Sequence, residues 1–379
     1  EIKIFAYAKN NALAKLKPLY LDISLNSASE KRRHRLMRCR GSDMAIQALP
    51  LLKEKGIPYS VVVVPWPLDS QHEMLDDLEA TVLYVEEFGP HLVQVSLPGY
   101  TEYFSNQQIF DRDELWELVV AKVRELRSFT KVPIVVMPSL FEENIYEVRK
   151  NLPRIIGLVC NSPAARGGLL PGDLISSING LSVRNKPQAR DLLSLLQKSD
   201  TNFATVGVER NGEVFQSNLN LNDFDYPYTR ETDSHLGVVF LGSGFRIGYL
   251  EKLRDILIAR EAKQVIILSS KLVKPTLEQC LSEAHLLGGD EITWHILVPE
   301  NRFFRGNIIM GDLLVVQDFI DCIRDYITRV NKKPDLAIIP SSPFNLNQWG
   351  RDLTGRVYLD IERYTGVPVE LLPCATIYD

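Results

Sequence analysis

"NSPAARGGLLPGDLISSINGLSV", residues 161–183, is the stretch that decides the fold at the centre of this 379-residue chain. Its Pro-Gly pair at 171–172 predicts a turn, and its Asn-Gly pair at 179–180 supplies the positive φ angles that a tight β-hairpin needs. Ile175 and Ile178, which lie between the two turns, are expected to face a core. The stretch therefore predicts a small β-rich module.

The segments that follow continue this pattern. An amphipathic helix is predicted over 187–197, and two strands are predicted over 203–221 around a second Asn-Gly turn at 211–212. Motif, helix and hairpin in this order resemble a bacterial PDZ domain. Such domains bind an extended peptide as an added strand and hold its carboxylate with N–H groups of an x-Φ-G-Φ loop, where Φ is apolar. The resemblance therefore implies a peptide or protein partner.

The x-Φ-G-Φ loop is expected before the stretch but is found after it, as His-Leu-Gly-Val at 235–238. Bacterial PDZ domains are often circularly permuted so that the groove strand comes last, and this order fits. The resemblance thus implies a peptide groove between Leu236, Gly237 and Val238 and the helix over 187–197. The alternative is a module that binds no free peptide and acts as a spacer or docks internally.

Composition limits the classes of function. A chain of 379 residues is expected to contain about two or three cores. Its 43 basic and 48 acidic residues give a net charge of −5 without long blocks of either sign, which argues against a nucleic-acid partner. No apolar run reaches the roughly 18 to 20 residues that span a bilayer, so we expect no membrane partner and a cytoplasmic location. The five cysteines form no C-x-x-C pair, and a disulfide framework or zinc knuckle is not expected.

Residues 1–145 are predicted to form repeating β/α units. Apolar, β-branched runs alternate with charged helical patterns, which is typical of parallel β/α architecture. The strands are expected at 19–25, 59–67, 91–98 and 132–139. In such folds the functional groups gather at the carboxyl ends of the strands.

The run "LDISLNSASEKRRHRLMRCRGSDMAIQALPLLKEKGIPYSVVVVPWP", residues 21–67, resembles the second half of a radical S-adenosylmethionine (SAM) enzyme barrel. In that family a strand ending in Ser is followed by an Arg-bearing helix. By this resemblance Ser24 and Asn26 would face the ribose or methionine part of SAM. Arg33, or alternatively Arg32, would pair with the SAM carboxylate, a task that suits a forked guanidinium.

The same resemblance implies a [4Fe–4S] cluster as a second cofactor. Its C-x-x-x-C-x-x-C ligands do not occur in this chain, and the expectation is that a cluster-bearing half precedes Glu1. The alternative is that Ser24, Asn26 and Arg33 are a helix cap and a solvated charge in another kind of α/β domain.

The last third of the chain, residues 246–379, is predicted to be a three-layer α/β domain. Its segment "VPENRFFRGNIIMGDLLVVQDF", residues 298–319, resembles the uncharacterised carboxyl-terminal domain of PDZ-bearing radical SAM proteins. Asn301, Phe303 and Phe304 mark a candidate pocket there. The two phenylalanines are expected to be either core residues or a lid over that pocket.

The predicted fold is thus α/β: a partial TIM-like, radical SAM-type β/α barrel over 1–145, a PDZ-like module over 146–245 and an α/β domain over 246–379. Three functions follow from it. The first is a radical SAM oxidoreductase or modifying enzyme whose PDZ and carboxyl-terminal domains present a substrate. The second is a non-catalytic PDZ scaffold that binds the carboxyl terminus of a partner. The third is a nucleotide-dependent α/β enzyme, in which the glycines of a dinucleotide-binding loop would be Gly242, Gly244 and Gly248.

Overall fold

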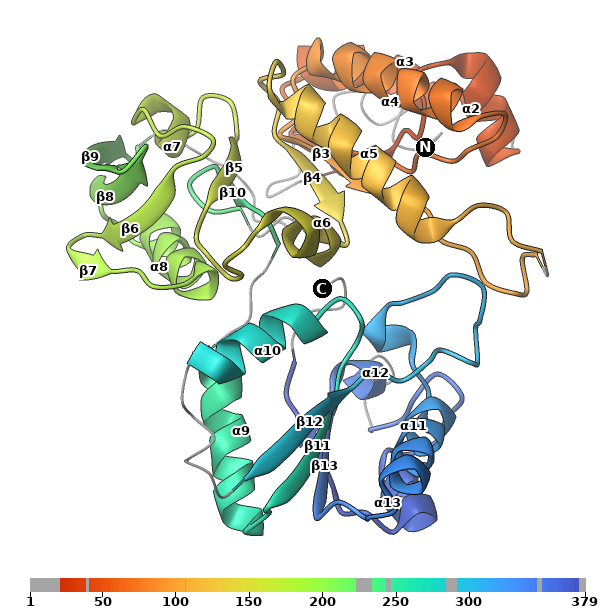
Figure 1. Ribbon diagram of the computed structural model, residues 1–379. Coiled ribbons are helices and arrows are strands. Elements are labelled where there is room, and N and C mark those ends of the chain that lie inside the picture. Colours follow the sequence, from red (N-terminus) through yellow and green to blue (C-terminus); the bar gives the residue numbers. More distant parts are fainter. Residues whose placement is uncertain are drawn as a thin grey trace. The chain divides into compact units, whose positions relative to one another are not determined.

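The chain is seen here in a computed structural model (Figure 1). It divides into two compact units, the first formed by 1–98, 110–139 and 152–243, the second by 99–109, 140–151 and 244–379. One sheet lies within 1–145, two lie within 146–245 and one lies within 246–379. The domain boundaries at 145 and 245 remain predictions. The residues that the structure describes are 21–38, 41–105, 107–222, 234–242, 247–283, 292–345 and 350–374.

The first sheet is parallel, with its strands in chain order: β1 (Leu21–Ser24), β2 (Tyr59–Val63), β3 (Leu92–Ser96) and β4 (Ile134–Met137). The helices between them are α2 (Glu30–Met37), α3 (Met44–Glu54), α4 (Gln71–Glu86) and α5 (Arg112–Arg127). Strand β2 is β-branched and almost wholly buried, as expected for a strand covered on both faces. The predicted β/α repeat is therefore present. The predicted barrel is not supported, because among the described strands this sheet is open at β1 and β4.

The middle module contains an antiparallel sheet in the order β7 (Leu181–Ser182), β6 (Leu174–Ile178), β8 (Phe203–Arg210) and β9 (Glu213–Asn220). A second, two-stranded antiparallel sheet joins β5 (Ile155–Leu158) to β10 (Val238–Phe240). Its helices are α7 (Pro163–Arg166) and α8 (Lys186–Lys198).

The two Asn-Gly hairpin turns are confirmed. The φ angles are 47° and 78° at 179–180, and 54° and 82° at 211–212. Positive φ at both central residues matches the right-handed twist of the flanking strands. Ile175 and Ile178 are buried in the core of the module, as expected.

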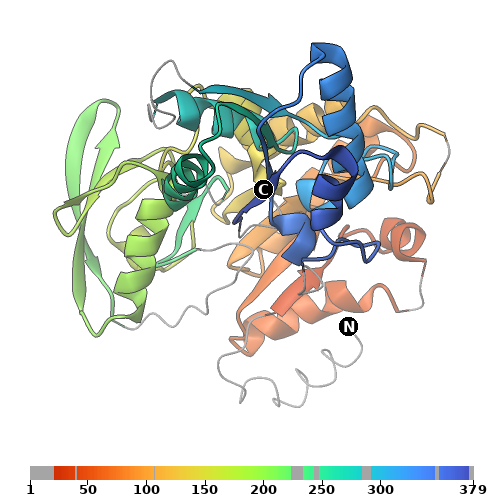
Figure 2. The ribbon, with the colours of Figure 1, turned by 90° about the horizontal axis from the view of Figure 1, so that it is seen from below.

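The second unit is built on a parallel sheet in the order β12 (Thr293–Leu297), β11 (Gln264–Leu268), β13 (Leu336–Pro340) and β14 (Val369–Leu372). Helices α9 (Ile247–Arg260) and α10 (Lys274–Glu283) pack on one face. Helices α11 (Val316–Val330), α12 (Ser342–Asn345) and α13 (Leu359–Thr365) pack on the other, and the 3₁₀ turn η3 (Gly311–Leu313) precedes α11. Figures 1 and 2 show α9 in teal and α11 in blue on opposite sides of the sheet. The predicted three-layer α/β arrangement is thus present.

Two segments from the first 151 residues belong to the second unit, which the sequence does not reveal. In 99–109, the Tyr100 N–H donates to Asn307 Oδ1 at 2.7 Å. In 140–151, which includes most of α6 (Ser139–Tyr146), Asn144 Nδ2 donates to the Leu272 carbonyl at 2.9 Å. The second unit is therefore assembled from three stretches of chain rather than one.

Candidate functional site

The loop before β10 has the geometry of an N–H cradle. Leu236 and Gly237 both have positive φ, at 53° and 85°. A Cβ atom on Gly237 would lie 2.1 Å from both Cβ and Oγ of Ser162, so no other residue fits there without displacing the neighbouring backbone. Ser162 is itself fixed, because it is fully buried and its Oγ accepts from the Ala165 N–H at the start of α7.

The loop carbonyls and most of its N–H groups have partners within the module. The carbonyl of Leu236 accepts from the Ala164 N–H at 3.1 Å, and that of Gly237 accepts from the Val159 N–H at 2.9 Å. The Val238 N–H donates to the His235 carbonyl at 3.0 Å. For the Gly237 N–H, no hydrogen bond to the described residues is found.

Helix α8 lies beside this loop and strand. It begins at Asn185, whose Oδ1 caps the helix by accepting from the Gln188 N–H at 3.0 Å. Near its carboxyl end, Gln197 Oε1 accepts from the Leu236 N–H at 2.8 Å. Near its amino end, buried Lys186 donates from Nζ to the Leu241 carbonyl. The structure thus brings Leu236, Gly237 and Val238 together with the helix that the sequence assigned to the groove.

The loop sits in a positive electrostatic environment. His235 is buried, and desolvation lowers its pKa to about 4, with the charges of Arg190 and Lys198 lowering it further and Asp191 opposing them. All three charged residues lie on α8. Two cations near this buried loop favour an anionic ligand, and a peptide carboxylate has that charge.

The stability of the PDZ-like module is expected to fall as the pH is lowered from 6.5 to 4. His235 stays mostly neutral in the folded chain until the pH approaches its lowered pKa of about 4, whereas its unfolded form takes up a proton near its ordinary pKa of 6.5, so acid favours the unfolded state. The expected loss between pH 7 and pH 4.5 is about 2 kcal/mol. Amide hydrogen exchange of the full chain, corrected for the intrinsic pH dependence, measures it over 203–220.

The matched variants are His235→Gln and His72→Gln. The first is expected to flatten the pH profile of the module. The second should leave it unchanged, because the His72 side chain is 86% exposed. A profile that keeps its slope in His235→Gln contradicts the assignment.

The residues predicted to bind SAM have other partners. Arg33 is fully buried, and its guanidinium donates to the backbone carbonyls of Ser42, Ser24 and Leu25. Asn26 has a φ of 60°, and its Oδ1 accepts from the Val64 N–H at 3.0 Å. Arg33 and Asn26 therefore hold the β1–α2 turn against its neighbours, and the predicted pairing of Arg33 with a ligand carboxylate is corrected to a structural role. Ser24 is exposed at the end of β1.

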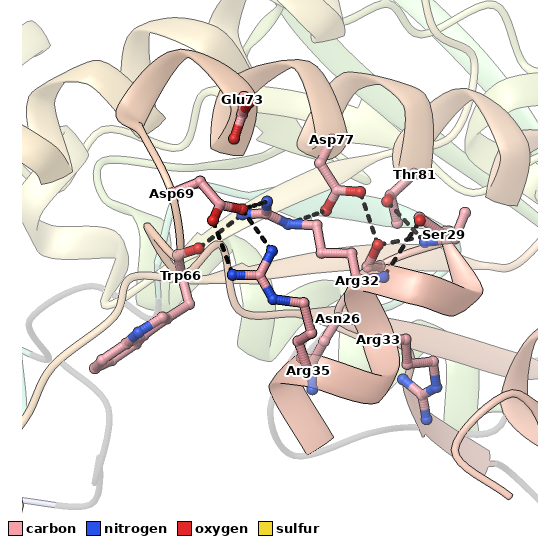
Figure 3. Close-up of polar contacts among 12 residues, drawn as sticks. Asn26, Ser29, Arg32, Arg33, Arg35, Trp66, Asp69, Glu73, Asp77 and Thr81 are labelled. Atoms are coloured by element: carbon pink, nitrogen blue, oxygen red, sulfur yellow. Dashed lines mark hydrogen bonds and ion pairs between the residues drawn. The ribbon is translucent and has the colours of Figure 1, made fainter. Parts of the chain in front are cut away.

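Arg32, the alternative to Arg33, is also engaged (Figure 3). Its Nε lies 3.2 Å from Asp77 Oδ2, and its Nη2 donates to the Trp66 carbonyl at 2.9 Å. The other oxygen of Asp77 accepts from Ser27 Oγ at 2.7 Å, and Asp69 accepts two hydrogen bonds from Arg35 at 2.7 and 2.8 Å. The polar groups at this sheet edge thus form a network that joins α2 to α4.

Asn301, Phe303 and Phe304, the candidate pocket residues, lie in one turn of the second unit. Asn301 pins its own turn, since its Oδ1 accepts from the Phe304 N–H at 2.9 Å and its Nδ2 donates to the Leu313 carbonyl at 3.1 Å. The rings of Phe303 and Phe304 meet edge to face at 4.8 Å, and Phe303 is exposed beside Tyr103. The aromatic pair is a surface feature of the second unit rather than its core.

The dinucleotide-loop hypothesis is wrong for a topological reason. It requires the strand before the glycines to be part of a parallel sheet. Strand β10, which precedes Gly242, pairs antiparallel with β5 in the PDZ-like module instead. Gly244 lies outside the described residues.

Sequence patterns missed three residues around the loop. Gln197, Arg190 and Lys198 supply its acceptor and its charge, but on the sequence they are ordinary polar residues of an amphipathic helix. Only the pairing of β10 with β5 brings the loop from position 236 to the end of α8. Long-range register of this kind has no local sequence signal.

Comparison with known proteins gives the same module. Residues 155–202 match the family of the PDZ domain. A Borreliella burgdorferi protein named "Putative zinc metalloprotease" is 30% identical over 123 residues, which is 32% of this chain and 27% of that protein, so the chain spans about a quarter of the length of this curated relative. Two solved structures are similar to part of this chain. They are the PDZ domain of an SdrC-like protein from Listeria monocytogenes (16% identity, TM-score 0.18, 24% of this chain and 90% of that one) and an HtrA-type protease with a decapeptide (21% identity, TM-score 0.15, 22% and 32%).

These matches overturn the radical SAM prediction. The family match is to a PDZ domain and the curated relative is named as a protease, so the predicted radical SAM, iron–sulfur, metal-binding and oxidoreductase character is wrong. Within the described parts of the chain no group of three or more His, Cys, Asp or Glu side chains is placed to hold a metal ion. No helix in those parts is long and apolar enough to cross a bilayer. What the matches support is that this mixed α/β chain contains a PDZ domain at residues 155–202.

Proposed function

We propose that the PDZ domain binds the carboxyl-terminal segment of a partner protein as an added strand between β10 and α8. The observation that carries this proposal is the loop at 235–238. Its two consecutive positive φ angles turn the backbone into β10, and the Gly237 N–H there lacks a partner among the described residues. Among the described strands β10 pairs only with β5, so its other edge is the one that an added strand would use.

A carboxylate at this loop would accept from the Gly237 N–H. It would also replace Gln197 Oε1 as the acceptor for the Leu236 N–H. The Gln197 amide oxygen is neutral, whereas the peptide carboxylate is charged. Charge-assisted hydrogen bonds are about twice as strong as neutral ones, which favours the exchange. Arg190 and Lys198 add a favourable field for the incoming anion.

The last side chain of the peptide is expected to be apolar. Leu236, Val238 and Phe240 are buried in the core cluster of the domain, and Leu192 and Leu196 of α8 pack against that cluster. An apolar residue inserted between these side chains gains about 25 cal/mol for each Å² that it buries. Valine or leucine at the peptide terminus would fit between these apolar side chains.

The similarity to the relative named as a zinc metalloprotease does not extend the proposal from partner binding to peptidase chemistry. That similarity covers 123 residues of this chain and about a quarter of the relative's own length. The geometric arguments for peptide binding lie in α8 and in the loop at 235–238. We therefore propose partner binding, and not peptidase chemistry, as the activity of the described residues.

The test is a binding assay on the full chain with labelled decapeptides that end in Val or Leu. The tightest binder from a random pool is resynthesised with a free carboxylate and with a carboxyl-terminal amide. Amidation is expected to weaken binding by roughly 10- to 100-fold, the value of a charge-assisted hydrogen bond of about 1.5–3 kcal/mol. Fluorescence anisotropy measures both affinities.

Variants that remove a charge test the electrostatic contribution to binding. Lys198→Gln is expected to weaken binding a few-fold and to reduce its salt dependence, because Lys198 is close enough to His235 to shift its pKa. Lys332→Gln is the matched control, since that lysine is exposed on the second unit. Equal affinity for the free and amidated peptides would rule out the carboxylate cradle.

A further inference from the structure

The sheet of the second unit has a topological switch point. Strands β11 and β13 are neighbours, but the chain leaves β11 into α10 on one face and leaves β13 into α12 on the opposite face. The two connections therefore separate at the carboxyl ends of the strands and open a crevice. In open parallel α/β sheets this crevice is where ligands bind.

A cavity occupies this position. The centre of a water molecule can move through about 80 Å³ of it. Its walls come from the ends of β11, β13 and β14, from α10, and from one residue each of α6, α12 and η3. The lining residues used in the proposal are Leu140, Thr276, Leu277, Gly311, Leu372 and Cys374.

Thr276 is the polar group of this cavity that points to a ligand. It is 2% exposed, and its Oγ1 is buried without a hydrogen-bond partner among the described residues. An unpaired buried hydroxyl costs roughly 1–3 kcal/mol. Two other polar groups of the wall are paired, since Ser270 Oγ accepts from the Val273 N–H and Cys374 Sγ donates to the Leu372 carbonyl. The Thr276 hydroxyl therefore remains available as both donor and acceptor.

The remaining wall is mainly apolar, with serine and cysteine side chains as its other polar groups. None of the described residues that line the cavity is Asp, Glu, Lys, Arg or His, so a charged ligand would lose its hydration without gaining a counter-ion. Gly311 allows η3 to close one side, because a Cβ there would lie 3.0 Å from Ser270 Cβ.

We propose that this cavity binds a small, uncharged, mainly apolar molecule, or the end of a larger one, that carries a single hydroxyl, carbonyl or amide group facing Thr276. The apolar part packs against Leu140, Leu277 and Leu372, and the polar group pairs with the Thr276 hydroxyl. This site lies wholly within the second unit and is independent of the peptide site in the first.

The test uses cyclopentanol as the probe, with cyclopentylammonium and cyclopentanecarboxylate as charged congeners of the same ring. The full chain, labelled at its methyl groups, is titrated and followed by NMR. Cyclopentanol is expected to give saturable shifts at Leu140, Leu277 and Leu372, and both charged congeners are expected to bind at least 10-fold more weakly. Absence of saturable shifts, or equal binding of a charged congener, overturns the proposal.

A variant pair isolates the hydroxyl. Thr276→Val removes the hydroxyl with little change of shape and is expected to weaken cyclopentanol binding by roughly 2- to 12-fold, the value of one neutral hydrogen bond. Thr293→Val is the control, because Thr293 is exposed on β12 and does not line the cavity. An unchanged affinity in Thr276→Val overturns the pairing with Thr276. If either variant fails to fold, the comparison of cyclopentanol with its charged congeners in the unmodified chain still tests whether the cavity binds an uncharged ligand.

Discussion

Replacing Gly237 with valine is expected to open the peptide loop of the PDZ domain, with a loss of more than about 4 kcal/mol in local stability. The φ angle of 85° is unfavourable for any β-branched residue, and the new Cβ would lie 2.1 Å from Ser162. Ser162 cannot move away, because it is fully buried and caps α7. Hydrogen exchange of the full chain, read over 155–166 and 234–242, measures the loss, and binding of the decapeptide should disappear with it.

Gly212→Val is the matched control, because it measures the cost of the positive φ angle without a steric clash. Its φ of 82° is nearly the same, but a Cβ there would meet no atom within 4 Å. Only the dihedral penalty of about 1–2 kcal/mol is therefore expected, confined to the β8–β9 hairpin. If the two variants lose equal stability, the close approach to Ser162 is not what fixes glycine at position 237.

The parts of the fold that the sequence predicts correctly are the ones with local causes. Each Asn-Gly pair sets its own turn, because both residues tolerate positive φ whatever surrounds them. The β-branched run in β2 marks a buried strand by its composition alone. Even the loop at 235–238 is recognisable, since the glycine that it needs is conspicuous between two apolar residues.

The parts that the sequence does not predict depend on where distant segments meet. Arg33 has the same guanidinium whether it binds a ligand or the carbonyls of Ser24, Leu25 and Ser42, and only the fold decides between these. Thr276 is an ordinary helix residue until the fold buries its hydroxyl. The docking of 99–109 and 140–151 onto the second unit likewise has no periodic pattern to reveal it.

Replacing Asp173 with alanine is expected to destabilise the PDZ domain by about 1.5–3 kcal/mol, the contribution of a hydrogen bond to a charged group. The Asp173 side chain is 1% exposed, and its two oxygens accept from Arg210 Nε and Nη2 at 2.6 and 2.8 Å. It also accepts from the Leu170 N–H at 2.8 Å, which closes the turn at 170–173. Removal leaves that N–H group and a forked guanidinium without their acceptor at once. Hydrogen exchange over 174–178 and 203–210 measures the effect.

Two further variants separate charge from hydrogen bonding. Asp173→Asn keeps an acceptor for the Leu170 N–H but removes the charge that pairs with Arg210, so its loss should lie between those of the native chain and Asp173→Ala. Asp200→Ala removes an exposed carboxylate from the same domain and is expected to have no measurable effect. If Asp173→Ala is as stable as Asp200→Ala, the turn is held by its Pro-Gly backbone alone. The pairing of Asp173 with Arg210 would then be a consequence of the fold rather than one of its causes.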